Sequence, residues 1–191
     1  MPCTSYPESK EEAIKCKVAF ALAGTAVVHL DNLDEGSVYG HGVIDSAITS
    51  TKINDRILGS NTLTKNLELS LCWFLSGNNL SPGKDAYRRW LVCNLVTQEE
   101  NPEERPDLKI KDLLSYVTAR RTTLLTSALV ILKAHALAGR PTGDWGPLGS
   151  FETWDPIVRG AVWWATGADC CQTRKAAAAE APERLSTLRL I

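Results

Sequence analysis

The N-terminal half of the chain alternates between helical and strand-like patterns of apolar residues. From Ser9 to Gly24 (SKEEAIKCKVAFALAG), two glutamates precede the apolar positions and a glycine closes the segment. This order predicts a helix that Ser9 caps. The next run, 25–32 (TAVVHLDN), is β-branched and apolar until it ends in Asp31 and Asn32. Such a run is typical of a buried strand whose carboxyl end opens on a site.

Two later apolar runs predict further strands. The run 69–75 (LSLCWFL) leads directly into the polar residues Ser76-Gly77-Asn78-Asn79, and the run 90–96 predicts a third strand. A short helix is expected at 43–50 and a helical turn at 86–89. Apolar strands that alternate with helices indicate an α/β fold.

The C-terminal half reads as helical. A polar stretch with two prolines, 98–106, is the expected linker between the two halves. Beyond it, apolar stripes at helical spacing are interrupted at Arg120 and Arg121, which predicts two helices or one helix bent there. A last helix is expected at 151–166, followed by an alanine-rich tail, 175–191.

Composition adds few constraints. The chain has 191 residues, of which 44% are hydrophobic and 23% charged, and its formal net charge is -1. Because no global basic field exists, any binding of nucleic acid has to be local, in a loop or groove, or shared among subunits. The N-terminus lacks a signal-peptide pattern and the apolar run near 18–30 is too short to span a bilayer, so we expect a cytoplasmic protein without membrane contact. The six cysteines form no CxxC pair and are expected to be reduced thiols.

The first acidic strand end is a candidate metal site. Ligands of open α/β sheets bind at the carboxyl ends of strands, and Asp31 has the place of a carboxylate that holds Mg²⁺ beside nucleotide phosphates. Asn32 can orient a water but cannot act as a base, so either Asp34 or Glu35 supplies that function or hydrolysis is slow. His29 lies inside the apolar run, which favours a hydrogen-bonded core histidine over a metal ligand.

The second strand end offers amide side chains. Asn78 or Asn79 fits a residue that positions an attacking water, although an Asn-Asn turn held by its own side chains fits the same residues. Arg88 and Arg89 follow at a distance that suits an arginine supplied across a subunit boundary in phosphoryl transfer, while a solvated face or an ion pair is the simpler interpretation.

The motifs taken in order resemble a known family. The ordered segments are EEAIKCKVAFALAGTAVVHLDNL, AITSTKINDRILGSN, SGNNLSPGKDAYRRWLVCNL, NPEERPDLKIKDLLSYVTARR, LVILKAHALAGRP and LGSFETWDPIVRGAVWW. Over roughly residues 8–174 they resemble the C-terminal ATPase region of phage and mobile-element primase-helicase proteins, of the bifunctional primase/polymerase type with an AAA+-like core related to superfamily 3 helicases.

The resemblance implies a fold. The expected fold class is α/β, with a partial P-loop NTPase (AAA+-like) three-layer core at 1–97, the linker at 98–106, an all-helical C-terminal lid at 107–174 and the tail at 175–191.

It also implies roles for single residues. Asp31 is expected to be the Mg²⁺-holding acid of the Walker B strand with Asn32 beside it, Asn79 and Asn78 the sensor, and Arg88 and Arg89 the inter-subunit arginines. Arg56 and Lys65 lie in the stretch where related helicases carry a DNA-contacting hairpin. Arg120 and Arg121 would reach nucleotide from the lid. The implied cofactors are Mg²⁺ and ATP, and the implied partners are single-stranded DNA and either a homo-oligomeric ring or a P-loop-bearing chain.

One departure from the family is large. The chain contains no GxxxxGK[ST] loop, and only about thirty residues precede Asp31. Without that loop the phosphates lose their backbone N–H cradle and the lysine, and apolar sheet surface is expected to lie exposed.

Two functions follow from this departure. One is part of a replication ATPase that couples ATP hydrolysis to DNA unwinding once a P-loop-bearing segment completes it, so that enzymatic activity of this chain alone is not expected. The alternative is a non-catalytic remnant or a module that binds DNA or a replication complex. An unrelated α/β enzyme that uses Asp31 and Asp34 has only its carboxylates in its favour.

Overall fold

The chain forms two compact units. The computed structural model describes residues 3–55, 63–83, 85–97 and 108–174. Unit 1 comprises Met1–Val92 together with Gln172–Ile191, and unit 2 comprises Cys93–Cys171. The expected linker, 98–106, and the tail, 175–191, lie outside the described residues. Each unit is therefore described by itself.

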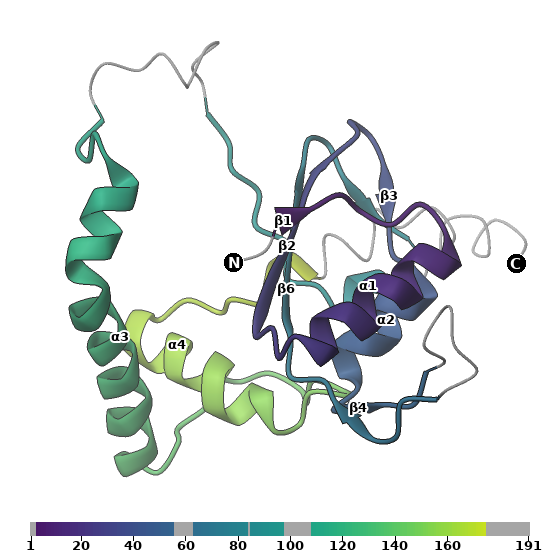
Figure 1. Cartoon of the computed structure of the whole chain (residues 1–191). Helices are drawn as coiled ribbons and strands as arrows, with labels where there is room; N and C mark the ends of the chain where they lie inside the picture. The colour runs from purple at the N-terminus through teal and green to yellow at the C-terminus, as the bar shows by residue number, and fades with distance from the viewer. Residues whose placement is uncertain (1–2, 56–62, 84, 98–107, 175–191) are drawn as a thin grey trace, which may run out of the picture. The chain divides into compact units, whose positions relative to one another are not determined.

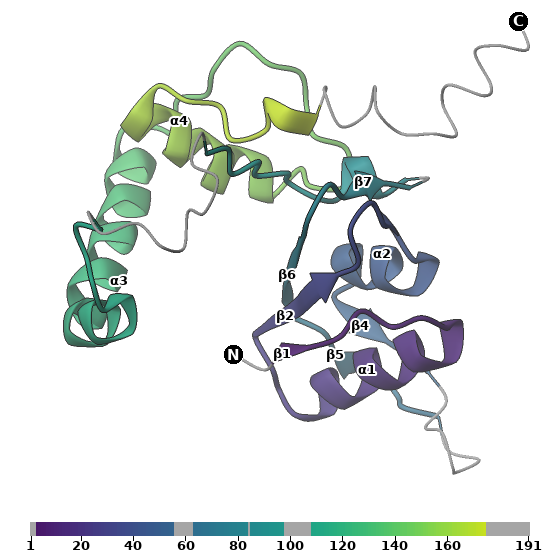
Figure 2. The same cartoon turned by 90° about the horizontal axis from the view of Figure 1, so that it is seen from above.

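Unit 1 is built on a small parallel sheet. Strands β1 (Cys3–Thr4), β2 (Val27–Leu33) and β6 (Cys72–Gly77) pair in the order β1-β2-β6, and both pairs are parallel. β2 and β6 run side by side in both views of the chain (Figures 1 and 2). Because parallel strands share one carboxyl edge, the polar residues that follow β2 and β6 come together.

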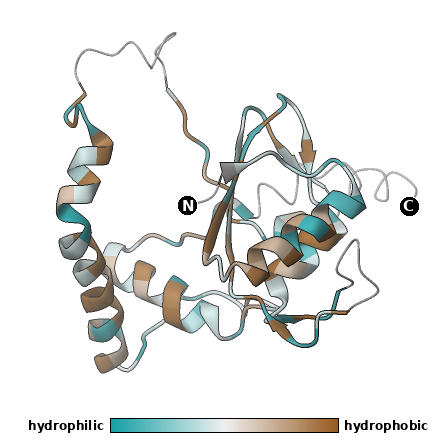
Figure 3. Cartoon of the chain, in the orientation of Figure 1, coloured by the Kyte–Doolittle hydropathy of each residue, from teal (hydrophilic) through white to brown (hydrophobic). Residues whose placement is uncertain are grey.

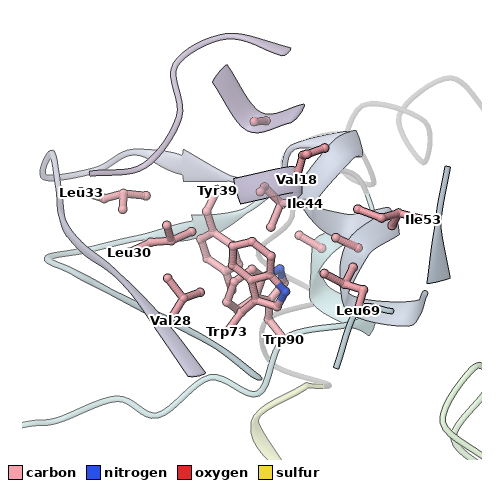
Figure 4. Close-up of a cluster of buried hydrophobic side chains, with 13 residues drawn as sticks. Val18, Val28, Leu30, Leu33, Tyr39, Ile44, Ile53, Leu69, Trp73 and Trp90 are labelled. Carbon is pink, nitrogen blue, oxygen red and sulfur yellow. The ribbon is translucent and has the colours of Figure 1, made fainter. Parts of the chain in front are cut away.

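Two helices cover one face of this sheet. Helix α1 (Lys10–Leu22) begins at Ser9, whose side chain accepts a hydrogen bond from the backbone of Glu12, and helix α2 (Gly42–Thr49) lies beside it (Figure 1). Side chains alternate along a strand, so Val28, Leu30 and Trp73 point to the same face. All three are buried against the helices, as the close-up of the core shows (Figure 4).

Two short ladders complete unit 1. β3 (Val38–Tyr39) pairs in parallel with β7 (Ser81–Pro82), just beyond the carboxyl ends of β2 and β6. β4 (Lys52–Ile53) pairs antiparallel with β5 (Leu67–Glu68). This pair is the base of a hairpin that lies between β2 and β6 in the sequence.

Unit 2 is helical in its regular elements. Helix α3 (Leu113–Leu137) begins at Asp112, whose side chain accepts from the backbone of Ser115. A single π-helical turn (Asp155–Arg159) runs directly into α4 (Gly160–Thr166). The buried His135 connects α3 to α4. Its Nε2 lies 2.9 Å from the carbonyl oxygen of Pro141, and its ring packs on Trp164 of α4. Apolar residues occupy much of the C-terminal half of α3 (Figure 3).

The mixed α/β fold agrees with the sequence, and two finer expectations do not. The run 90–96 forms no strand: Leu95 is 98% exposed, while Trp90 turns back to pack on Tyr39. Of the two alternatives for the stripes around Arg120 and Arg121, the structure has the single helix, α3. Within the described part of unit 1, the sheet and its helices form two layers instead of three, and Phe74 on the other face is 53% exposed.

No helix within the described ranges combines the length and the apolar character that crossing a membrane requires.

Candidate functional site at the carboxyl edge of the sheet

A bulge places Asp31 at the end of β2. Leu30 pairs with Leu75 and Leu33 pairs with Gly77, so β2 has one residue more than β6 between these pairs. At the bulge Asn32 adopts a left-handed backbone conformation, with a φ of 56°, which asparagine tolerates. Bulges re-aim side chains and are frequent beside active sites. The Asp31 side chain remains 49% exposed, so a ligand from solvent can reach its carboxylate.

Ser76 joins the two strand ends. Its hydroxyl donates to Asp31 Oδ1 at 2.5 Å and accepts from the backbone N–H of Asn32 at 3.4 Å. The same Ser76 Oγ lies 2.9 Å from His29 Nε2, which is itself 3.5 Å from Asp31 Oδ1. His29 is therefore not enclosed in the core as the sequence suggested. It lies on the face opposite the helices, with a quarter of its side chain exposed.

The loops after β2 and β6 bind one another. The Asn79 side-chain amide donates to Glu35 Oε1 at 2.8 Å, and the Gly36 N–H donates to the Asn78 carbonyl at 3.1 Å. Asn79 has a φ of 53°, as expected for a turn, yet its side chain bonds across to the other loop rather than within its own turn. Asp31, Asn32, Asn78 and Asn79 are thus brought to one edge of the sheet.

Gly77 is required where the two loops separate. A Cβ atom at this position would lie 2.8 Å from the Leu33 carbonyl oxygen and 3.0 Å from Leu80 side-chain carbons. The close approach of the two strands at the bulge therefore depends on a residue without a side chain.

Arg88 and Arg89 share one carboxylate. Asp85 Oδ2 accepts from Arg88 at 2.8 Å and from Arg89 at 3.2 Å, and these two hydrogen bonds are the main reason why the pKa of Asp85 is lowered. The Arg88 side chain is 46% exposed, against 18% for Arg89. Arg88 is the last residue of η1 (Ala86–Arg88), the helical turn expected at this place, and Arg89 is its C-cap. Of the two, Arg88 is the one that another molecule can reach.

The hairpin between β2 and β6 has a fixed base. Lys17 on α1 forms an ion pair of 2.8 Å with Asp55, and the backbone of Asp55 bonds the Thr64 side chain and backbone. Lys65 follows, exposed, beside a hollow of about 460 Å³ between the end of α1 and β5. Arg56, the other residue expected to bind nucleic acid, lies outside the described residues.

Arg120 and Arg121 lie on α3 in unit 2. Both are exposed, and the Arg120 guanidinium lies 4.3 Å from the centre of the Tyr116 ring. The contacts within unit 2 give no support to a nucleotide-binding role for either arginine.

Sequence reasoning missed two polar groups of unit 1. Ser76 precedes the Asn-Asn pair, but its contact with Asp31 depends on a pairing between residues 45 positions apart. Asp45 is buried in α2, where it accepts from Trp90 Nε1 at 3.4 Å, and burial is the main cause of its raised pKa. A carboxylate in the first turn of a helix gives no sequence signal that separates such a buried acid from an exposed one.

Comparison with known proteins assigns no family to this chain, since no family model, no curated protein and no solved structure matches it.

Proposed function

We propose that this chain is the Walker B and sensor part of a DNA-replication ATPase of the primase-helicase type. A segment with a phosphate-binding loop completes the nucleotide site, and the complete protein couples ATP hydrolysis to DNA unwinding. The proposal rests on the residues of the sheet edge and on the resemblance in the order of the motifs.

One observation carries the proposal. β2 and β6 are adjacent parallel strands whose carboxyl ends bring Asp31 and Asn79 to one edge, and an antiparallel hairpin lies between the two strands in the sequence. In enzymes that catalyse phosphoryl transfer, an acidic side chain holds the metal ion and a polar side chain such as an amide orients the attacking water. A hairpin inserted between the two strands supports a contact with DNA at Lys65.

The donor atoms at the edge fit a divalent cation. Mg²⁺ keeps several waters and is usually held by one or two carboxylates, and the half-exposed Asp31 leaves room for such waters. Bound Mg²⁺ would neutralise charge on the transferred phosphoryl group. Asn79, tied to Glu35, orients a water from the neighbouring loop, and Arg88 is available to a neighbouring subunit.

The test is a titration of the isotope-labelled chain with Mg²⁺·ATP, followed by NMR. We expect shifts of the Asp31, Asn32 and Asn79 amide signals. Binding should be weak and require millimolar nucleotide, because these residues alone do not supply the backbone N–H groups that hold the phosphates. Asp31→Ala should abolish the shifts, whereas Asp144→Ala, an exposed aspartate of unit 2, should leave them intact.

Shifts confined to other residues, or shifts that persist in Asp31→Ala, would contradict the proposal. The chain alone should show no ATP-dependent unwinding. Hydrolysis by the chain alone that requires Mg²⁺ and Asp31 would show that the phosphate loop is dispensable.

A further inference from the structure

Three polar side-chain atoms of different residues form a triangle at the carboxyl ends of β2 and β6. They are His29 Nε2, Asp31 Oδ1 and Ser76 Oγ, and their separations are 2.9 Å, 2.5 Å and 3.5 Å. An imidazole nitrogen, a carboxylate oxygen and a hydroxyl oxygen from two adjacent strands thus lie within 3.5 Å of one another. The bulge in β2 and the hydrogen bond from the Asn32 backbone to Ser76 hold this arrangement.

These three residue types suggest a hydrolytic triad, but the contacts do not have that geometry. A serine nucleophile requires the aspartate on Nδ1 of the histidine and the serine on Nε2. Here Asp31 and Ser76 both approach the same nitrogen, Nε2, and Ser76 donates its proton to the carboxylate. The hydroxyl is therefore not activated by the imidazole.

The triangle does have the dimensions of one face of a metal coordination sphere. Ligands at about 2.1 Å from a six-coordinate ion are separated by about 3 Å when they are neighbours. The three separations scatter around this value. The side chains of Asp31 and His29 are 49% and 25% exposed, so an ion can enter from solvent and keep waters in its remaining positions.

We propose that His29, Asp31 and Ser76 bind a divalent cation directly, and that the imidazole makes this site prefer a first-row transition metal over Mg²⁺. Oxygen-only sites suit Mg²⁺, whereas imidazole nitrogen suits transition metals. The inference rests on the proposed function in so far as this ion is the one that accompanies the nucleotide, but metal binding is measured separately from nucleotide binding. In the bound state the His29 proton lies on Nδ1, because Nε2 needs its lone pair for the metal.

The experiment uses Mn²⁺ and Co²⁺ with the full chain. Mn²⁺ binding is followed by electron paramagnetic resonance, and pulsed measurements detect ¹⁴N coupling when an imidazole nitrogen is a ligand. We expect one bound Mn²⁺ with ¹⁴N coupling, a d–d absorption band for Co²⁺, and poor competition by Mg²⁺. His29→Ala should weaken Mn²⁺ binding by about tenfold or more, and Ser76→Ala should weaken it less.

The control is His41→Asn, which keeps a side chain able to cap α2 and leaves the triangle untouched. Its Mn²⁺ affinity should equal that of the parent chain. The ¹⁴N coupling is measured on the parent chain, so the test stands even if His29→Ala fails to fold.

Each other outcome has a defined meaning. Bound Mn²⁺ without ¹⁴N coupling, or Mg²⁺ binding as tightly as Mn²⁺, would overturn this inference and leave an oxygen-only site compatible with the proposed function. No Mn²⁺ binding at all would overturn it too. Nitrogen-ligated Mn²⁺ without any effect of ATP on the Asp31 amide would keep the metal site and contradict the proposed function.

Discussion

The two units each contain a cluster of charged side chains, and the clusters differ in how far they are exposed to solvent. In unit 1, Asp31 is half-exposed at a strand end, beside side chains that hold it in place. In unit 2, the Arg159 side chain is only 7% exposed, and it pairs with Asp155 and Asp169. The first cluster is open to a ligand, and the second is closed within the protein.

The closed cluster is nearly saturated by its own contacts. Arg159 donates to both carboxylate oxygens of Asp169, at 2.7 and 2.8 Å, and to Asp155 at 3.0 Å. Its guanidinium also lies 4.2 Å from the centre of the Trp145 ring. Asp169 in turn accepts from the Cys171 N–H at 2.9 Å. Such a cluster ties the π-helical turn to the segment after α4, and the Arg159 side chain is almost entirely shielded from solvent.

A charged residue of this chain therefore indicates a binding site only where its side chain lies within reach of solvent. Burial alone would rank Arg159 above Asp31 as a functional residue. The solvent exposure of Asp31, together with the polar side chains of His29 and Ser76 beside it, reverses that ranking. Mutations should therefore separate the two clusters, because one should control stability and the other ligand binding.

The largest expected effect comes from opening the closed cluster. Arg159→Leu leaves two carboxylates without their cation, and breaking a buried pair in this way costs about 3–5 kcal/mol of folding free energy. Urea unfolding should show the loss, and hydrogen exchange should place it in α3 and α4. Asp31→Ala should cost no more than about 1.5 kcal/mol, the net contribution of a hydrogen bond such as the one that Asp31 accepts from Ser76.

Arg120→Ala is the matched control, because Arg120 is an exposed arginine of the same unit. A small effect of Arg159→Leu, or an effect of Asp31→Ala as large as that of Arg159→Leu, would remove the contrast between the clusters.

The second prediction concerns the backbone that forms the open cluster. Gly77→Ala places a Cβ 2.8 Å from the Leu33 carbonyl oxygen, so we expect a loss of about 1–3 kcal/mol from overpacking and weaker Mn²⁺ binding. Gly42→Ala is the control, because nothing lies within 4 Å of a Cβ there and Gly42 is the first residue of α2. Equal stability of both variants in urea would show that the strands separate without cost.

How much of this could be read from the sequence differs between the parts of the site. The strands at 25–32 and 69–75 were predicted close to β2 and β6, because long apolar runs that end in polar residues report a buried strand. Asp31 and Asn79 followed from those strand ends. Ser76 did not, because its role arises only when the register places it opposite the bulge of β2.

The errors have physical causes as well. The run 90–96 has strand-like residues, but strand preference depends on packing partners, and Val96 is 89% exposed. The ladders β3–β7 and β4–β5 consist of two-residue strands, which are too short to show a period. The partners of Arg159 lie 4 and 10 residues away, and nothing in the sequence marks Asp169 as one of them.

The third prediction uses Cys171, beside the closed cluster, as a reporter, with an exposed cysteine of unit 1 as its reference. Burial is the main reason why the pKa of the Cys171 thiol is raised to about 12, whereas Cys72 lies exposed on the open face of β6. Iodoacetamide should therefore modify Cys72 much faster than Cys171 near neutral pH, as mass spectrometry of the peptides can measure.

The raised pKa also has a consequence for stability. Above the ordinary thiol pKa of 9.0 the unfolded chain loses this proton while the folded chain keeps it, so unfolding becomes more favourable as pH rises toward 12. Cys171→Ser should reduce this alkaline loss in unit 2. Equal alkylation rates of Cys72 and Cys171 would show that the cluster of unit 2 is not closed.

The smallest expected effect is that of Lys65, which tests whether the open unit contacts DNA at its hairpin. Lys65 is exposed beside β5, and one phosphate contact contributes about one unit to the salt dependence of binding. Lys65→Ala should lower the slope of log affinity against log salt by about that amount for single-stranded oligonucleotides of any sequence. The measurement is fluorescence anisotropy, with Lys10→Ala, an exposed lysine at the start of α1, as the control. If both variants keep the parent slope, the hairpin base makes no phosphate contact, and any DNA binding by this chain has to be sought elsewhere.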